Sequence, residues 1–130
     1  MQLSETVKLH PTREQQTLLS ATMETYIATV NGLVSDAIKG VSIAKLTSKD
    51  VTAALPSALR NQCIRDAKSI VTKHYKSCRK AVVKNRRLME RGLDIRVTAP
   101  NLPILRKPCC YINNQNFRIL GNCIEFPVMV

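Results

Sequence analysis

One long stretch of regularly spaced apolar residues most constrains the fold of this chain. Between positions 18 and 38 an apolar side chain recurs every three or four residues, which places these side chains on one face of an α-helix. Thr12 and Gln15 precede the stretch with the spacing of a capping box, and Gly40 follows it as a C-terminal cap. The pattern therefore predicts a long helix that must bury one face against another element.

A second long helix is predicted from Ser57, its expected N-cap, to about Arg91. Pro56 separates it from the preceding segment, where Ser48 is placed to cap a shorter helix that runs through Leu55. One side of the second long helix is expected to pack on the first helix through a stripe of mostly apolar residues: Leu59, Cys63, Ala67, Ile70, Val71, His74, Cys78 and Val82.

The two ends of the chain show the patterns of β-structure. Residues 2–9 alternate between apolar and polar side chains and predict a short strand, while residues 113–116 and the pair Gly121-Asn122 are typical of hairpin turns. The predicted fold class is α+β, with two long packed helices, a short helix and a small antiparallel sheet built from the first strand and the C-terminal strands. A length of 130 residues fits a single domain, with residues 1–11 and 93–130 as the β part and 12–92 as the helical part.

The positive charge of the chain is concentrated in one quarter of its length. Residues 60–91 hold eleven Lys and Arg against Asp66 and Glu90, so that this segment carries +9 of the total +11. Such clustering is typical of a partner that carries many phosphates, because each neutralised phosphate releases condensed counterions. The alternative is a solvated helix face, although such faces usually alternate in sign.

The sequence offers little for an enzyme, and no cofactor or metal is expected. The nine acidic residues are scattered, and the four glycines lie too far apart for a phosphate loop. His74 and Cys78 have a spacing that permits metal ligation, but two ligands do not make a zinc site. The five cysteines are odd in number and without knuckle spacing, and no membrane span or secretion signal is recognisable. A cytoplasmic protein without contact to membranes is therefore expected.

Several segments together resemble one family, the TnpB proteins, which are transposon-encoded relatives of type V CRISPR effectors. Residues 8–15 (KLHPTREQ) look like the opening of these proteins, and residues 55–67 are similar to the start of their second recognition helix. Residues 103–108, 113–117 and 124–127 resemble the returning strands of their wedge domain. The resemblance covers nearly the whole chain in the order of the family.

The resemblance implies a function in RNA-guided DNA cleavage. In TnpB endonucleases a split wedge domain and a helical recognition lobe bind the guide RNA and the target DNA, and a separate nuclease domain cuts. This chain would supply the wedge and the recognition lobe of a longer nuclease and no catalytic residue. By resemblance and charge together, the residues expected to contact nucleic acid are Ser57, Arg60, Asn61, Gln62, Arg65, Lys68, Lys76, Arg79, Lys80, Lys84, Arg86 and Arg87.

Two other functions remain open from the sequence. The chain could be a stand-alone DNA-binding regulator that lays its basic helix on a duplex. It could also be a structural protein whose basic face meets an acidic partner. A charge of +9 over 32 residues exceeds what solubility requires and favours the two functions that involve nucleic acid over the structural one.

Overall fold

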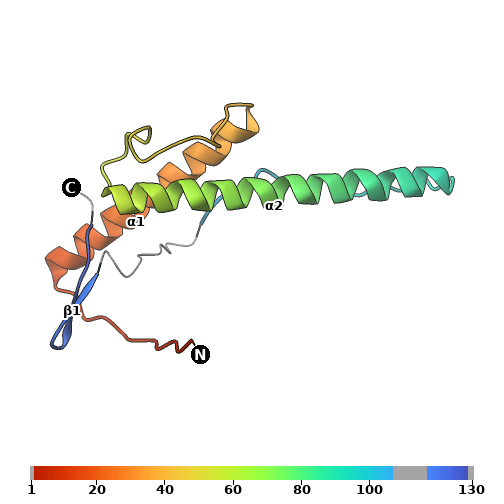
Figure 1. The fold of residues 1–130 in the computed structure, drawn as a ribbon. Coiled ribbons are helices and arrows are strands. Elements are labelled where there is room, and N and C mark those ends of the chain that lie inside the picture. Colours follow the sequence, from red (N-terminus) through yellow and green to blue (C-terminus); the bar gives the residue numbers. More distant parts are fainter. Residues whose placement is uncertain (1, 107–116, 129–130) are drawn as a thin grey trace.

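Two long helices and one small hairpin make up the regular structure of the chain. The computed structural model describes residues 2–106 and 117–128, in which α1 (Arg13–Ile38) is followed by α2 (Ser57–Glu90), β1 (Arg118–Leu120) and β2 (Cys123–Glu125). Helix α2 crosses α1 near its own first turns and then extends far beyond it (Figure 1). The predicted α+β class is confirmed.

Helix α1 begins with the expected cap, both helices are followed by a glycine, and α2 begins differently from the prediction. Thr12 caps α1 with a complete capping box: its hydroxyl accepts from the Gln15 backbone N–H at 3.2 Å, and its own N–H donates to the Gln15 side chain at 2.9 Å. Gly40 and Gly92 follow the two helices at φ +102° and +74°, a left-handed conformation that glycine adopts without steric cost. The N-cap of α2 is Pro56 rather than the predicted Ser57, which is the first helical residue.

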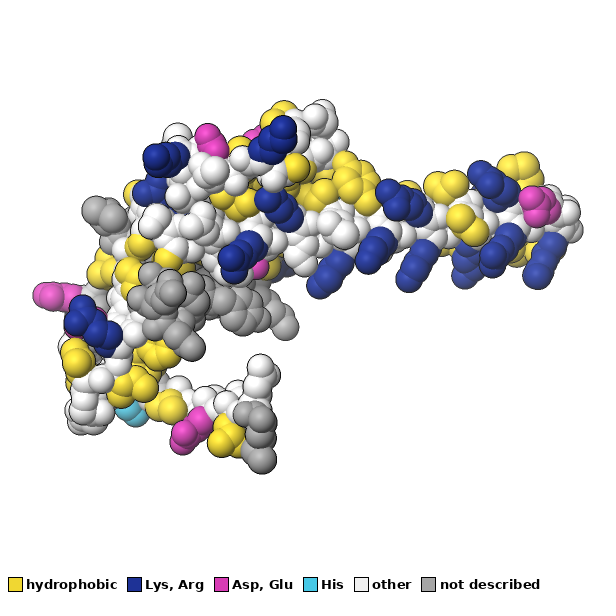
Figure 2. Space-filling view, in the orientation of Figure 1, with side chains coloured by type: hydrophobic (Ala, Val, Ile, Leu, Met, Phe, Trp, Pro, Cys, Tyr) yellow, Lys and Arg dark blue, Asp and Glu magenta, His cyan; other side chains and the backbone are white. Residues whose placement is uncertain are grey.

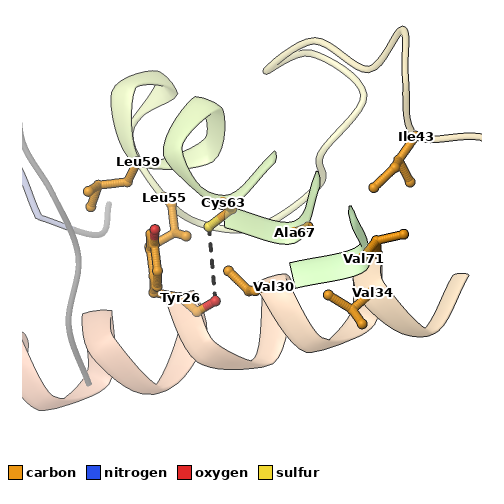
Figure 3. Close-up of a cluster of buried hydrophobic side chains, with 9 residues drawn as sticks. All are labelled: Tyr26, Val30, Val34, Ile43, Leu55, Leu59, Cys63, Ala67 and Val71. Carbon is orange, nitrogen blue, oxygen red and sulfur yellow. Dashed lines mark hydrogen bonds between the residues drawn. The ribbon is translucent and has the colours of Figure 1, made fainter. Parts of the chain in front are cut away.

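The core lies where the first turns of α2 pack on α1. Figure 3 shows the side chains of α1 pointing toward those of α2, with Ile43 and Leu55 of the connecting loop closing the cluster. The Cys63 thiol also donates to the Tyr26 carbonyl oxygen at 3.9 Å. We call this cluster the proximal core; its members are Tyr26, Val30, Val34, Ile43, Leu55, Leu59, Cys63, Ala67 and Val71.

The segment of residues 93–106, here the return segment, leads back from the tip of α2 toward α1 and is held by two asparagines. Asn85 of α2 donates to the Val97 carbonyl oxygen at 3.1 Å and accepts from the Val97 N–H at 2.6 Å. Asn31 of α1 makes the same pair of bonds with Leu105, at 3.1 and 2.7 Å. Each side-chain amide thus pairs with one backbone residue as a neighbouring strand would.

Two predicted elements are wrong. Residues 2–10 form no strand, so the sheet consists, among the described residues, of the β1–β2 hairpin, in which Ile119 faces Ile124 across the Gly121-Asn122 turn. Residues 48–55 form turns and bends instead of a short helix, because the side chain of Arg60 binds the backbone carbonyls of this loop. The hairpin turn predicted at residues 113–116 lies outside the described residues. Over the part of the chain that is described, no helix has the length and hydropathy of a membrane span.

Candidate nucleic-acid interface

Helix α2 separates its apolar and its basic side chains onto different sides. A step of about 100° per residue places nine of its Lys and Arg residues within an arc of about 160°. The buried side chains, such as Leu59, Cys63 and Ala67, centre on the opposite side, against α1. The nine basic residues are Arg65, Lys68, Lys73, Lys76, Arg79, Lys80, Lys84, Arg86 and Arg87.

The second half of α2 carries most of this basic side. We call residues 72–90 the arm and residues 57–71 the proximal half of α2. Seven Lys and Arg side chains of the arm are exposed, and Figure 2 shows such side chains along its whole length, most of them on one side. We call them the arm cations: Lys73, Lys76, Arg79, Lys80, Lys84, Arg86 and Arg87.

Carboxylates do not neutralise the basic side. Across residues 2–106 and 117–128, no Asp or Glu forms an ion pair with a Lys or Arg of α2, whereas Arg118 and Glu125 in the hairpin lie 3.4 Å apart. Asp66 is one of two acidic residues on α2, and its carboxylate accepts hydrogen bonds from the Tyr26 hydroxyl and from the Gln62 amide. It is therefore bound toward α1 rather than toward the arm cations.

Two of the residues predicted to contact nucleic acid have roles within the fold. The Arg60 Nε donates to the Leu55 carbonyl oxygen at 2.8 Å, and its Nη1 donates to that of Ser48 at 3.0 Å. The Lys68 Nζ donates to the Ala44 carbonyl oxygen at 3.0 Å. Both side chains fix the loop between the helices, and Lys68 keeps only part of its donor capacity for a ligand.

The other predicted residues of the proximal half differ in how free their side chains are. Ser57, Asn61 and Arg65 are exposed. Gln62 is half-buried, and its Nε2 donates to the Asp66 carboxylate at 3.0 Å. Of the two amides, Asn61 thus has the freer side chain, because Gln62 already uses one of its two N–H groups.

The structure places the six predicted residues of the arm on one side of the helix, and one further residue lies with them. Lys76, Arg79, Lys80, Lys84, Arg86 and Arg87 are all exposed. Lys73 is exposed on the same side and is not among the residues predicted to contact nucleic acid. Its spacing of three residues from Lys76 was the signal that would have included it.

His74 and Cys78 lie side by side on α2, with the Cys78 Sγ and the His74 Nε2 3.6 Å apart. Both side chains are half-buried. Among the described residues, no three His, Cys, Asp or Glu side chains lie close enough together to hold a metal ion. The contact between Cys78 and His74 joins neighbouring turns of the helix.

No protein-family model, curated protein or solved structure matches this chain. Support for the candidate interface therefore comes from the geometry and the charge of α2 alone.

Proposed function

We propose that the chain is a nucleic-acid-binding module in which the arm cations contact phosphates. The observation that supports this most is that seven exposed Lys and Arg side chains follow one another on one helix, with no carboxylate paired to them among the described residues. Unpaired surface cations of one sign create a field that attracts polyanions and raises their association rate. A helix face that serves only solubility has no need for this asymmetry.

The dimensions of the arm fit several phosphates at once. From Lys73 to Arg87 the helix rises by about 21 Å, which corresponds to about six base pairs of duplex. If all seven arm cations contact phosphates of B-DNA, the slope of log affinity against log salt approaches about −6. Because phosphate contacts carry no sequence information, the arm would position the ligand, and the exposed Asn61 would be a candidate for contact with a base.

The resemblance to TnpB proteins gives the proposal a more specific form. In that form the chain is the wedge and recognition module of an RNA-guided endonuclease, works in the cytoplasm, and binds a structured guide RNA and the DNA beside the target. It contributes no catalytic group of its own. A stand-alone regulator that binds duplex DNA through the same arm is the second candidate, and the same charge distribution supports it.

The proposal is tested by fluorescence anisotropy with a labelled 24-base-pair DNA duplex and an RNA hairpin, titrated at several salt concentrations. A variant in which Lys76, Arg79, Lys80 and Lys84 are all replaced by Gln should bind more than about 100-fold more weakly at 0.1 M salt. Its salt slope should become less negative by about 3 to 4, since four phosphate contacts are lost.

A matched control removes the same charge elsewhere. Lys8, Lys39, Lys45 and Lys49 are exposed and lie outside α2, so their replacement by Gln should change affinity far less. Equal losses in both variants, or no loss in the first, would refute a specific role for the arm. Sequencing any RNA that co-purifies separates the candidates: a structured RNA supports the TnpB-like form, whereas duplex binding without RNA supports the regulator.

A further inference from the structure

The arm lacks the packing that holds the proximal half of α2. Five of the six buried residues of α2 lie between Leu59 and Val71, and the sixth is Ala81, whose side chain is a single methyl group. The larger apolar side chains of the arm stay in contact with water, with Val82 59 % and Met89 62 % exposed. Helices in proteins owe most of their stability to such packing, so the arm has little of its own.

The charges of the arm oppose its helix. Residues three or four positions apart are neighbours on a helix, and like charges at these spacings destabilise it. Five such pairs lie among the arm cations: 73–76, 76–79, 76–80, 80–84 and 84–87. Glu90 is the one acidic residue of the arm, and it forms no ion pair with any described residue.

Besides the burial of Ala81 and the partial burial of Cys78 and Leu88, the contacts that hold the arm are polar. The amide of Asn85 fixes the return segment at Val97, and the C-terminal turn is closed by Leu93, whose N–H donates to the Leu88 carbonyl oxygen at 3.0 Å. Segments with few buried apolar contacts and exposed backbone open at a small fraction of the global unfolding free energy. The arm has few buried apolar side chains, and most of its residues are exposed to solvent.

We infer that the arm is a helix whose order is controlled by its ligand: free of polyanion it opens repeatedly, and a bound polyanion closes it by cancelling the repulsion between its cations. The inference rests on the proposed function for the nature of the ligand. Ordering then accompanies binding, so part of the binding energy is spent on fixing the helix and the return segment attached to it at Val97. The proximal half stays ordered throughout, because burial and not charge holds it.

Hydrogen exchange followed by mass spectrometry tests the inference on the full chain at 20 mM salt. Without ligand, the amides of residues 74–90 should exchange at least 10-fold faster than those of residues 59–71. A saturating 24-base-pair DNA duplex should slow exchange in the arm at least 10-fold and change the proximal half less than 2-fold. Equal protection of the two halves without ligand would overturn the inference.

A single substitution separates the inference from the proposed function. Lys80→Glu turns two repulsive pairs, with Lys76 and Lys84, into attractive ones, and Glu and Lys have similar helix propensity. The free arm of this variant should exchange more slowly than that of the original chain, although the variant binds the duplex more weakly. Lys45→Glu makes the same charge change in the exposed loop and should leave arm exchange unchanged. An arm that exchanges at the same rate in Lys80→Glu as in the original chain would refute the inference.

Inorganic polyphosphate and 0.5 M sodium chloride complete the design. If both slow exchange in the arm while the DNA duplex does not bind, the inference that charge repulsion opens the arm is supported and the proposed function is refuted. If the duplex binds and exchange in the arm does not change, the proposed function is supported and the inference is refuted.

Discussion

The proximal half and the arm of α2 belong to one uninterrupted helix of 34 residues, yet different forces shape them. In the proximal half Leu59, Cys63 and Ala67 are completely or almost completely buried against α1. In the arm the apolar residues are mostly exposed and the cations have no carboxylate partner among the described residues. Continuous secondary structure therefore does not imply uniform packing along a helix. The proximal half is held by burial against α1, and the arm extends beyond it with its cations exposed.

The largest expected effect on stability follows from truncating a side chain of the proximal core. Leu59→Ala leaves a cavity beside side chains that cannot fully close it, and it should lower the free energy of unfolding by about 3 kcal/mol. Val82→Ala in the arm, at 59 % exposure, should cost less than about 0.5 kcal/mol. Urea denaturation followed by circular dichroism measures both. Similar costs would show that the arm is as well packed as the core.

A smaller effect is expected at the hydrogen bond that ties α1 to α2. The Tyr26 side chain is fully buried, and its hydroxyl donates to the Asp66 carboxylate. Tyr26→Phe should lower the free energy of unfolding by about 1 to 2 kcal/mol, because the carboxylate loses a donor at a partly buried site. Tyr75→Phe, in the arm and 44 % exposed, is the matched control and should leave the urea midpoint unchanged. A midpoint that shifts equally in both would contradict the distinction.

Asn31 in α1 and Asn85 in the arm form the same pair of hydrogen bonds with the return segment, so their replacement compares the two regions directly. Asn31→Ala should lower the free energy of unfolding by about 1 kcal/mol, since Leu105 packs against the proximal core. Asn85→Ala should change it by less than about 0.5 kcal/mol, because the arm contributes little to global stability. Its expected signature is local: limited proteolysis near Val97 becomes faster. Unchanged cleavage there would mean that other contacts hold the return segment.

The smallest effect concerns Asp50 in the loop. The Thr47 backbone N–H, at 2.7 Å from the carboxylate, and then the Thr47 hydroxyl, at 3.0 Å, hold the pKa of Asp50 below its ordinary value. A lowered folded-state pKa contributes stability above the ordinary pKa and loses it as the pH falls through the lowered value. The melting temperature of Asp50→Asn should therefore lie slightly below that of the original chain at pH 7, and the difference in melting temperature should become smaller toward pH 3. A difference that grows in acid would contradict the lowered pKa.

The helices of this chain could be predicted closely because their signals are local. The capping box at Thr12 and the apolar period behind it define α1, and Gly40 ends it. The period also locates the buried side of α2 as far as Val71, but it then places Val82 on the stripe where the structure buries Ala81. Past Val71 little packs on the helix besides the return segment, and a periodic pattern cannot say which residue that segment will cover.

Elements that depend on distant partners could not be predicted in the same way. The alternation in residues 2–9 marks a segment that is able to pair, but a strand forms only where another edge receives it, and none of the described residues does. Ser48 offers a helix cap in sequence, yet Arg60 binds the Ser48 and Leu55 carbonyls from the next helix and favours an irregular loop. Resemblance and charge together placed Arg60 in the candidate interface, because neither shows which groups a side chain contacts in the fold.

The two asparagines, Asn85 and Asn31, hold the return segment at two fixed points along the chain. Seven residues lie between Val97 and Leu105, the two points at which Asn85 and Asn31 bind it. An extended chain over these eight steps reaches at most about 27 Å, so the two amides tether the arm to α1 within that distance. Both tethers bind the backbone N–H and carbonyl groups of the segment and not its side chains. The length of the tether therefore depends on how many residues lie between the two points, not on the side chains at positions 97 and 105.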